Sequence, residues 1–121
     1  MLINVIFILI SIILGVIGQL VIKHGTTAVG AFDFSDAINF LKAAFTNFYI
    51  WAGLGCYVLS SITWIITLSR VELSYAYPMV SIGYVLVLFF SSWFFGEKVL
   101  PIHYAGVALI IAGVVLITKG R

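Results

Sequence analysis

Four long apolar runs, separated by short polar stretches, dominate the sequence. They cover residues 2–22, 49–69, 75–95 and 102–118, and a helix that crosses the hydrocarbon core needs about 20 such residues. A signal peptide is the other interpretation of the first run, but it requires basic residues before the run, whereas Lys23 and His24 follow it. The pattern therefore predicts four retained transmembrane helices.

The segment from Gly25 to Asn47 has a different pattern. Asp33 or Ser35 is placed to cap a short helix. Within that helix, apolar side chains recur at helical spacing, and polar ones fall on the other side: the apolar set is Phe34, Ile38, Leu41 and Phe45, and the polar set is Asp36, Asn39 and Lys42. This predicts an amphipathic helix that lies in the membrane interface, with a plain polar loop as the alternative.

Composition excludes several classes of protein. The chain has 121 residues, 64% of them apolar and 8% charged, whereas soluble domains carry about 25% charged residues. A net charge of +2 without a basic run argues against nucleic-acid binding, and the lone Cys56 excludes an internal disulfide. We therefore expect a single all-α integral membrane domain over residues 1–121.

Catalytic and proton-carrying groups are missing from the apolar runs. None of the runs contains Asp or Glu, the residues with which many transporters carry protons. The sequence has no Ser/His/Asp set, metal-ligand spacing or glycine-rich phosphate loop. We expect neither an enzyme nor a metal or cofactor site.

Lys and Arg are evenly divided between the two sides of the membrane. With four spans, Arg70, Lys119 and Arg121 share one side, and Lys23, Lys42 and Lys98 share the other. Because the excess of positive charge sets orientation, a balanced chain can insert either way, which permits an antiparallel pair of identical subunits. A fixed orientation set by a partner chain is the alternative.

Each of the first three runs carries one small or polar stripe. The stripes are Ser11, Gly15 and Gln19; then Gly53, Cys56, Ser60, Thr63 and Thr67; then Tyr77, Ser81, Tyr84 and Ser91/Ser92. Such stripes often only let helices pack closely in lipid. Because these three also carry large hydrogen-bonding groups, we expect a polar groove lined by Gln19, Trp64, Tyr77, Ser81 and Tyr84.

The fourth run has a smooth, nearly apolar seam. Gly106 and Gly113 are one heptad apart, with Leu109 between them. Small residues at this spacing favour close contact between helices in lipid, so we expect a subunit interface. Internal packing against the third span is the alternative.

Several motifs together resemble the drug/metabolite transporter superfamily, in particular its four-helix members that function as dimers. The matching motifs are residues 15–23 (GVIGQLVIK), 76–81 (AYPMVS), the Gly96-Glu97 turn and residues 106–113 (GVALIIAG). Small multidrug resistance exporters carry an essential Glu in the first helix, and that position is Gly15 here. The chain is more similar to aminoarabinose-phosphoundecaprenol flippase subunits at Gly18-Gln19, Trp64–Leu68, residues 76–79, Glu97 and His103.

This resemblance implies a multi-pass inner-membrane transporter that flips a polyprenyl-phosphate-linked sugar or a similar amphiphile. The partner is either a second copy of the chain or a related four-helix subunit. Lys23, Arg70 and Lys98, at the span ends, are expected to attract the substrate phosphate, with ordinary snorkelling of long cationic side chains to the interface as the alternative. The alternatives are an exporter of small cationic or metabolite solutes and an accessory subunit that transports nothing.

Overall fold

Four membrane-spanning helices and a short crosswise helix form the chain. The computed structural model describes residues 2–119. Its elements are α1 (Leu2–Val29), the 3₁₀ turn η1 (Phe34–Asp36), α2 (Ala37–Phe45), α3 (Phe48–Leu68), α4 (Leu73–Met79), α5 (Ser81–Phe95) and α6 (Pro101–Lys119). Four stretches are long and apolar enough to cross a membrane: α1, α3, α4 with α5, and α6. The predicted fold class is confirmed.

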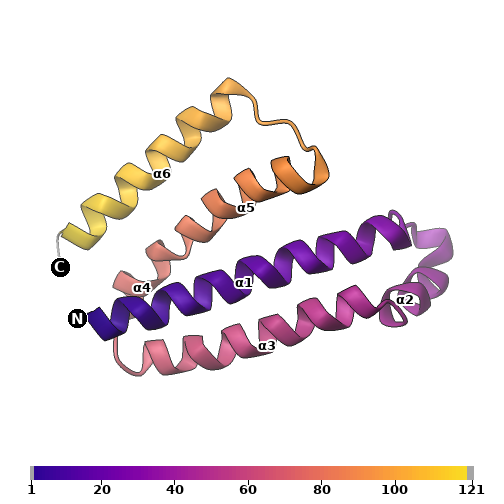
Figure 1. Ribbon diagram of the computed structural model, residues 1–121, viewed down its shortest axis with the longest axis horizontal. Helices are drawn as coiled ribbons and strands as arrows, with labels where there is room; N and C mark the ends of the chain where they lie inside the picture. Colours follow the sequence, from indigo (N-terminus) through magenta and orange to yellow (C-terminus); the bar gives the residue numbers. More distant parts are fainter. Residues whose placement is uncertain (1, 120–121) are drawn as a thin grey trace.

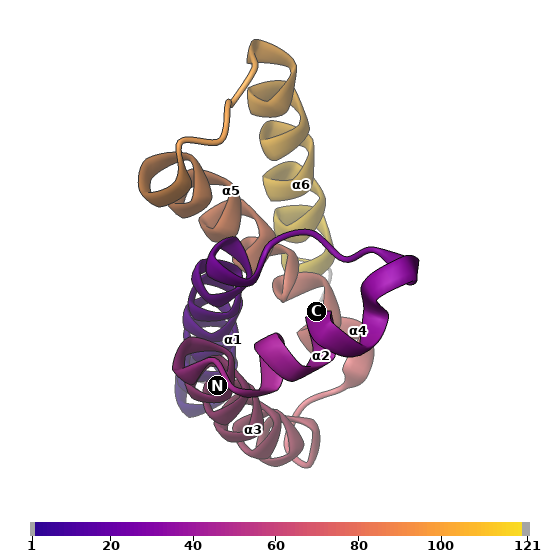
Figure 2. The same ribbon diagram turned by 90° about the vertical axis from the view of Figure 1, so that its right-hand side faces the viewer.

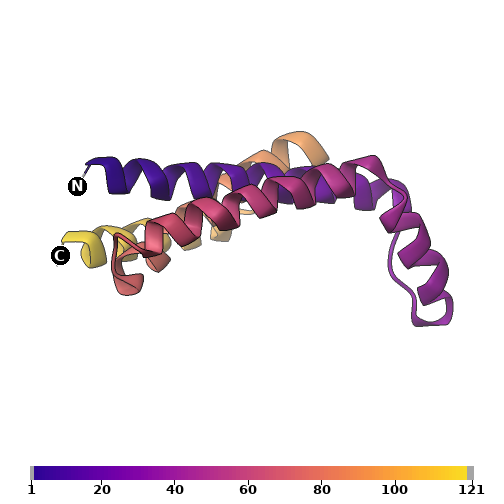
Figure 3. The ribbon, with the colours of Figure 1, turned by 90° about the horizontal axis from the view of Figure 1, so that it is seen from below.

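The closest packing in the chain is between α1 and α3, which run side by side along most of their length (Figures 1 and 3). Glycines make this approach possible. A Cβ added to Gly53 would lie 2.8 Å from the Gly18 carbonyl oxygen, and one added to Gly18 would lie 3.0 Å from the Gly53 carbonyl oxygen. The two backbones are therefore in contact, as small residues allow in lipid.

Hydroxyl groups tie the same two helices together. Ser11 Oγ donates to Thr63 Oγ1 at 2.8 Å, and Ser60 Oγ donates to the Ser11 carbonyl oxygen at 2.8 Å. Ser11 is buried, and so is Thr67 one turn beyond Thr63. For these members of the polar stripes, helix packing is the correct interpretation, because their hydrogen bonds are used within the bundle.

The first helix is longer than the sequence pattern predicted. It continues seven residues past Ile22 to Val29. The hydroxyls of Thr26 and Thr27 donate to carbonyl oxygens one turn earlier in the same helix. Gly25 is buried against Ile50 of α3, where an added Cβ would meet Ile50 Cγ1 at 2.7 Å. Gly25, at which the sequence pattern changes, is therefore a packing position inside α1.

The third span, predicted over residues 75–95, is broken near its start, where Pro78 in the sequence favours either a hinge or a first helical turn. α4 ends at Met79 and α5 begins at Ser81, so the break is at Val80. Pro78 has no backbone N–H to donate to the preceding turn. The Ser81 hydroxyl donates to the Pro78 carbonyl oxygen across the break. The span therefore changes direction two residues after the proline (Figure 1).

The interfacial segment forms a helix, as expected. Asp33 accepts a hydrogen bond from the Ser35 backbone N–H and so caps the 3₁₀ turn that leads into α2. α2 turns away from the long axis of the bundle at one end of the spans (Figure 3). Phe34 and Ile38 are exposed, and Trp51 Nε1 donates to the Phe45 carbonyl oxygen, which fixes α2 to α3. An exposed apolar face at the end of the spans is typical of an interfacial helix.

α6 stands apart from the α1–α3 pair. Gly96, at φ 68°, ends α5 in the left-handed conformation that favours glycine, and α6 then runs back toward α4 (Figures 1 and 2). Val114 joins the buried core cluster that includes Ile8, Ala76 and Met79. Most of the remaining α6 surface is exposed and faces lipid or another chain.

Candidate functional site

A cavity of about 880 Å³ lies between three of the four spans. α1 contributes Ser11, Ile12, Gly15, Val16 and Gln19; α3 contributes Tyr57, Ser60 and Trp64; α4, α5 and the break between them contribute Tyr77, Pro78, Val80, Ser81, Gly83, Tyr84 and Val87. These positions are in the middle parts of α1 and α3 and around the break in the third span. The cavity is therefore at membrane depth.

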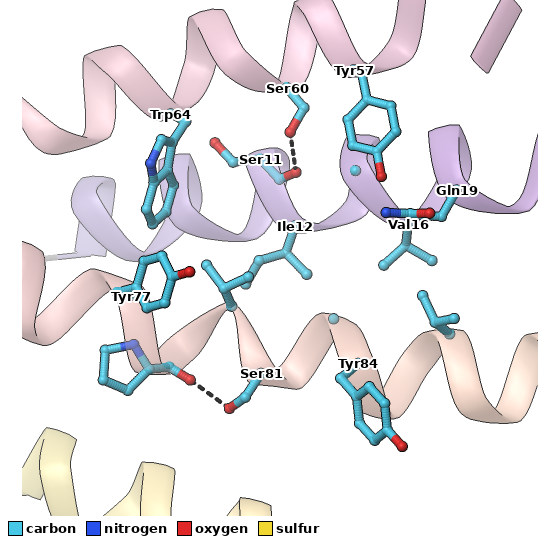
Figure 4. Close-up of a pocket in the computed structure, with 15 residues that line it drawn as sticks. Ser11, Ile12, Val16, Gln19, Tyr57, Ser60, Trp64, Tyr77, Ser81 and Tyr84 are labelled. Carbon is cyan, nitrogen blue, oxygen red and sulfur yellow. Dashed lines mark hydrogen bonds between the residues drawn. The ribbon is translucent and has the colours of Figure 1, made fainter. Parts of the chain in front are cut away.

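Five of the seven predicted substrate-binding residues line this cavity. They are Gln19, Trp64, Tyr77, Ser81 and Tyr84. Each comes from one polar stripe or from a position beside it, and the packing of α1 against α3 and α5 brings the three stripes to one space. Figure 4 shows Trp64 and Tyr77 at one end of the cavity, and Gln19 with Tyr57 toward the other.

The large polar side chains of the cavity retain their hydrogen-bonding capacity. Ser11, Ser60 and Ser81 use their hydroxyls on protein acceptors. Within residues 2–119, no hydrogen bond occupies the side chains of Gln19, Tyr57, Trp64, Tyr77 and Tyr84. Tyrosine and glutamine both donate and accept, while the tryptophan Nε1–H only donates. The cavity therefore offers a mixed set of donors and acceptors beside aromatic faces.

The cavity is open to the side of the bundle. Tyr77 and Tyr84, which form part of its wall, are 66% and 57% exposed. Since these residues belong to a membrane-spanning stretch, the surface on which they are exposed faces the bilayer or a partner chain. A molecule with a long hydrocarbon tail can place its polar end in such a cavity while the tail stays outside.

Tyr57 is the large polar residue of the cavity lining that the sequence pattern did not predict. It lies one position beyond Cys56 of the second stripe and points its hydroxyl into the cavity beside Gln19 (Figure 4). The sequence did contain a signal for Tyr57. Tyrosines of membrane proteins gather at the membrane interfaces, whereas Tyr57 is near the centre of α3, where a polar side chain indicates a site inside the bundle.

Lys23 and Arg70 lie outside the cavity, at opposite ends of the α1–α3 pair. Lys23 is exposed and follows Gln19 by one helical turn. Arg70 is exposed just after α3, and its Nε donates to Asn4 Oδ1 at 2.8 Å. The structure therefore places one cation near each membrane surface and neither in the lining.

The two histidines have local structural contacts. His24 packs edge-on against Tyr49, with ring centroids 4.5 Å apart. His103 Nδ1 accepts the Leu100 backbone N–H at 2.9 Å at the start of α6. In the described part of the chain, no three His, Cys, Asp or Glu side chains are grouped so that they could hold a metal ion.

The seam on α6 is open. A Cβ added to Gly106 or Gly113 would meet nothing within 4 Å, and Leu109 between them is 74% exposed. Val107 and Val114 on a neighbouring face are buried. Within residues 2–119, no side chain or other helix lies within 4 Å of a Cβ added at either glycine, which does not support the alternative that the glycines serve internal packing against the third span.

Sequence comparison finds relatives that share one description, "Probable 4-amino-4-deoxy-L-arabinose-phosphoundecaprenol flippase subunit ArnE". The relative from Escherichia coli K12 is 35% identical over 107 residues, 87% of each chain. That from Pseudomonas fluorescens is 32% identical over 70% of this chain and 71% of its own length.

A third relative, from Pseudomonas savastanoi pv. phaseolicola, is 35% identical over 72 residues, 60% of this chain and 63% of its own length, just under two thirds. No family model matches the chain. No solved structure matches it. With about a third of the residues identical over most of both chains, the chain belongs to the ArnE family of probable flippase subunits.

Proposed function

We propose that this protein is a subunit of a flippase that moves a polyprenyl-phosphate-linked amino sugar across the bilayer. The observation that carries the proposal is the cavity at membrane depth, which combines unused hydrogen-bonding groups with an opening to the side of the bundle. A lipid-linked sugar has a polar headgroup that hydrocarbon excludes and a tail that can remain in it. The relatives described as flippase subunits for such a lipid support the same conclusion.

The large side chains of the cavity suit a sugar. Trp64, Tyr77 and Tyr84 present aromatic faces and polar edges, and Gln19 and Tyr57 supply further donors and acceptors. Sugars present apolar ring faces together with hydroxyl edges, so these groups match both parts. Cavities of roughly 300–1,000 Å³ are typical for small-molecule ligands, and this one lies within that range.

The two flanking cations have a separate role in the proposal. Lys23 and Arg70 attract the phosphate as the headgroup enters or leaves, one at each membrane surface. The bond that Arg70 Nε donates to Asn4 Oδ1 holds the Arg70 side chain against α1, while the terminal guanidinium nitrogens remain available for a phosphate oxygen.

The functional unit in this proposal has two subunits, which meet at α6. Support comes from the exposed Gly106, Leu109 and Gly113 face, since small residues let helix backbones approach closely in lipid. The partner is a second copy, in either orientation, or a related four-helix subunit. We place the complex in the inner membrane, because outer membranes hold β-barrels rather than apolar helices.

A reconstitution experiment tests the function. The chain is purified with any subunit that copurifies with it and is placed in liposomes that contain a short-chain polyprenyl-phosphate amino sugar. Externally added periodate, which does not cross the bilayer, oxidises the diol of outward-facing sugars only. The proposal expects the protected fraction to disappear much faster with protein than in empty liposomes. Equal rates in the two preparations contradict it.

The same liposomes test the alternative functions. Uptake of a hydrophobic cation with no movement of the lipid would indicate an exporter instead. If neither the cation nor the lipid moves, the chain is an accessory subunit. The open cavity speaks against this last alternative, because a bundle that only stabilises a partner has no need for one.

A further inference from the structure

All fifteen residues that line the cavity are uncharged. The charged residues of the described chain lie at the ends of spans or in the connections between them, Lys23 and Arg70 included. Arg70 is bonded to Asn4, and Lys23 is 19 positions beyond Asn4 in α1, a rise of roughly 28 Å at 1.5 Å per residue. That distance is close to the thickness of the hydrocarbon core, so the cations are at its two surfaces and the space between is neutral.

A neutral cavity at this depth discriminates by net charge. An ionised group that leaves water for a site of low polarity loses its solvation, and the loss is severe when no opposite charge accompanies it. When a cation and an anion travel in one molecule, each stabilises the other and the net charge that crosses is zero. The hydrogen-bonding groups of the cavity then need only solvate a dipole.

The headgroup named in the descriptions of the relatives has this property. A 4-amino sugar joined to a polyprenol through phosphate carries one ammonium group and one phosphodiester anion. The cavity provides partners for both: the Trp64 Nε1–H and the tyrosine hydroxyls can donate to phosphate oxygens, while the Gln19 carbonyl oxygen can accept from an ammonium group.

Building on the proposed flippase function, we infer that the cavity selects headgroups of zero net charge, whose own ammonium group neutralises their own phosphodiester, and moves them without a coupled ion. Gly15 contributes to this property, because it forms part of the cavity wall and has no side chain that could carry a proton.

Three lipids that differ only at the amine test the selection. The complex is reconstituted as above with the 4-amino lipid, its N-acetyl derivative and its N,N-dimethyl derivative. Acetylation removes the positive charge, whereas dimethylation adds comparable bulk and keeps it. We expect the amino and dimethyl lipids to flip at similar rates and the acetyl lipid at least about tenfold more slowly. Equal rates for the amino and acetyl lipids, or equal slowing of both derivatives, overturn the inference.

A membrane potential tests the absence of a coupled ion. Each elementary charge that crosses 100 mV contributes about 2.3 kcal/mol, which corresponds to a ratio of about 50 between the two leaflets at equilibrium. With a potassium diffusion potential of this size, we expect the 4-amino lipid to distribute within about twofold of evenly. A ratio near 50 in either direction shows one coupled charge per headgroup and overturns the inference.

A charge placed in the cavity provides a third, independent measurement. Gln19→Lys adds a cation that can neutralise a lone phosphodiester, so the rate difference between the amino and acetyl lipids should shrink severalfold relative to Gln19→Met, which adds none. An unchanged difference contradicts electrostatic selection. If the lysine variant does not fold, the wild-type measurements still decide.

The failure of the inference is distinct from the failure of the proposed function. If all three lipids flip equally fast, the protein is a flippase and only the charge selection is wrong. If none flips faster than in empty liposomes, both the flippase function and this inference are wrong.

Discussion

Replacement of Gly53 by alanine tests how the α1–α3 pair is built. The new methyl carbon would lie 2.4 Å from Ile22 Cγ1, 3.0 Å from the Ile22 backbone nitrogen and 2.8 Å from the Gly18 carbonyl oxygen. The Ile22 side chain can rotate away, but the backbone atoms can be relieved only if the two helices separate. Separation also stretches the Ser11–Thr63 bond and the bond from Ser60 to the Ser11 carbonyl.

The expected loss in free energy of unfolding follows from these contacts. Overpacking of a tight interior costs about 1–3 kcal/mol, and an interhelical hydrogen bond in a membrane protein contributes about 0.6 kcal/mol. If both bonds are weakened, we expect Gly53→Ala to lower the free energy of unfolding by about 2–4 kcal/mol.

Gly55 provides a matched control in the same helix. An added Cβ there would meet nothing within 4 Å, so Gly55→Ala changes helix propensity in the same way as Gly53→Ala but adds no clash. Both variants can be unfolded reversibly by SDS in mixed micelles and followed by circular dichroism. If their free energies of unfolding differ by less than about 0.5 kcal/mol, the close contact between α1 and α3 does not contribute as described.

Three further predictions concern the interface and the site. Gly106→Leu or Gly113→Leu should weaken subunit association, measured by cross-linking in lipid, whereas Ala108→Leu, about 200° round α6 from Gly106, should leave association unchanged. Unaltered association in the glycine variants would place the interface elsewhere. Arg70→Ala should lower the initial flipping rate about tenfold through loss of a charge-assisted contact, and Arg70→Lys should recover much of it; full activity in Arg70→Ala would remove this residue from headgroup capture. Gly15→Glu should fold, since an added Cβ only reaches ordinary contact with Ser60 Oγ at 3.5 Å. It should flip the lipid more slowly than Gly15→Gln, because the carboxylate gives the cavity a net charge that a headgroup of zero net charge does not compensate; equal rates would contradict this.

The hydrophobic pattern by itself determined the spans and the class of fold. In lipid a lone segment must satisfy its backbone hydrogen bonds internally, so apolar length translates directly into a helix. The same pattern gave the crosswise helix, because Phe34 and Ile38 fall on one face at helical spacing and Asp33 caps the turn before them. The pattern did not determine where the first helix ends. Glycine occurs both at helix ends and at close contacts between helices, and only the packing of α3 against Gly25 shows that the second case applies here.

Tertiary structure decided what each polar residue does. A stripe shows which residues share one face of a helix, but it does not show what that face contacts, because the contact depends on how the helices cross. Ser11 and Gln19 both line the cavity, but the Ser11 hydroxyl is used in a bond to Thr63 across the close helix contact, whereas the Gln19 side chain, two turns further along the same stripe, makes no hydrogen bond within residues 2–119. Tyr57 enters the cavity from beside its stripe, and the break at Val80 places Tyr77 and Tyr84 in the same wall. These outcomes require the crossing of α1, α3 and α5, because contact between residues far apart in sequence depends on the distance between helices and not on periodicity within one of them.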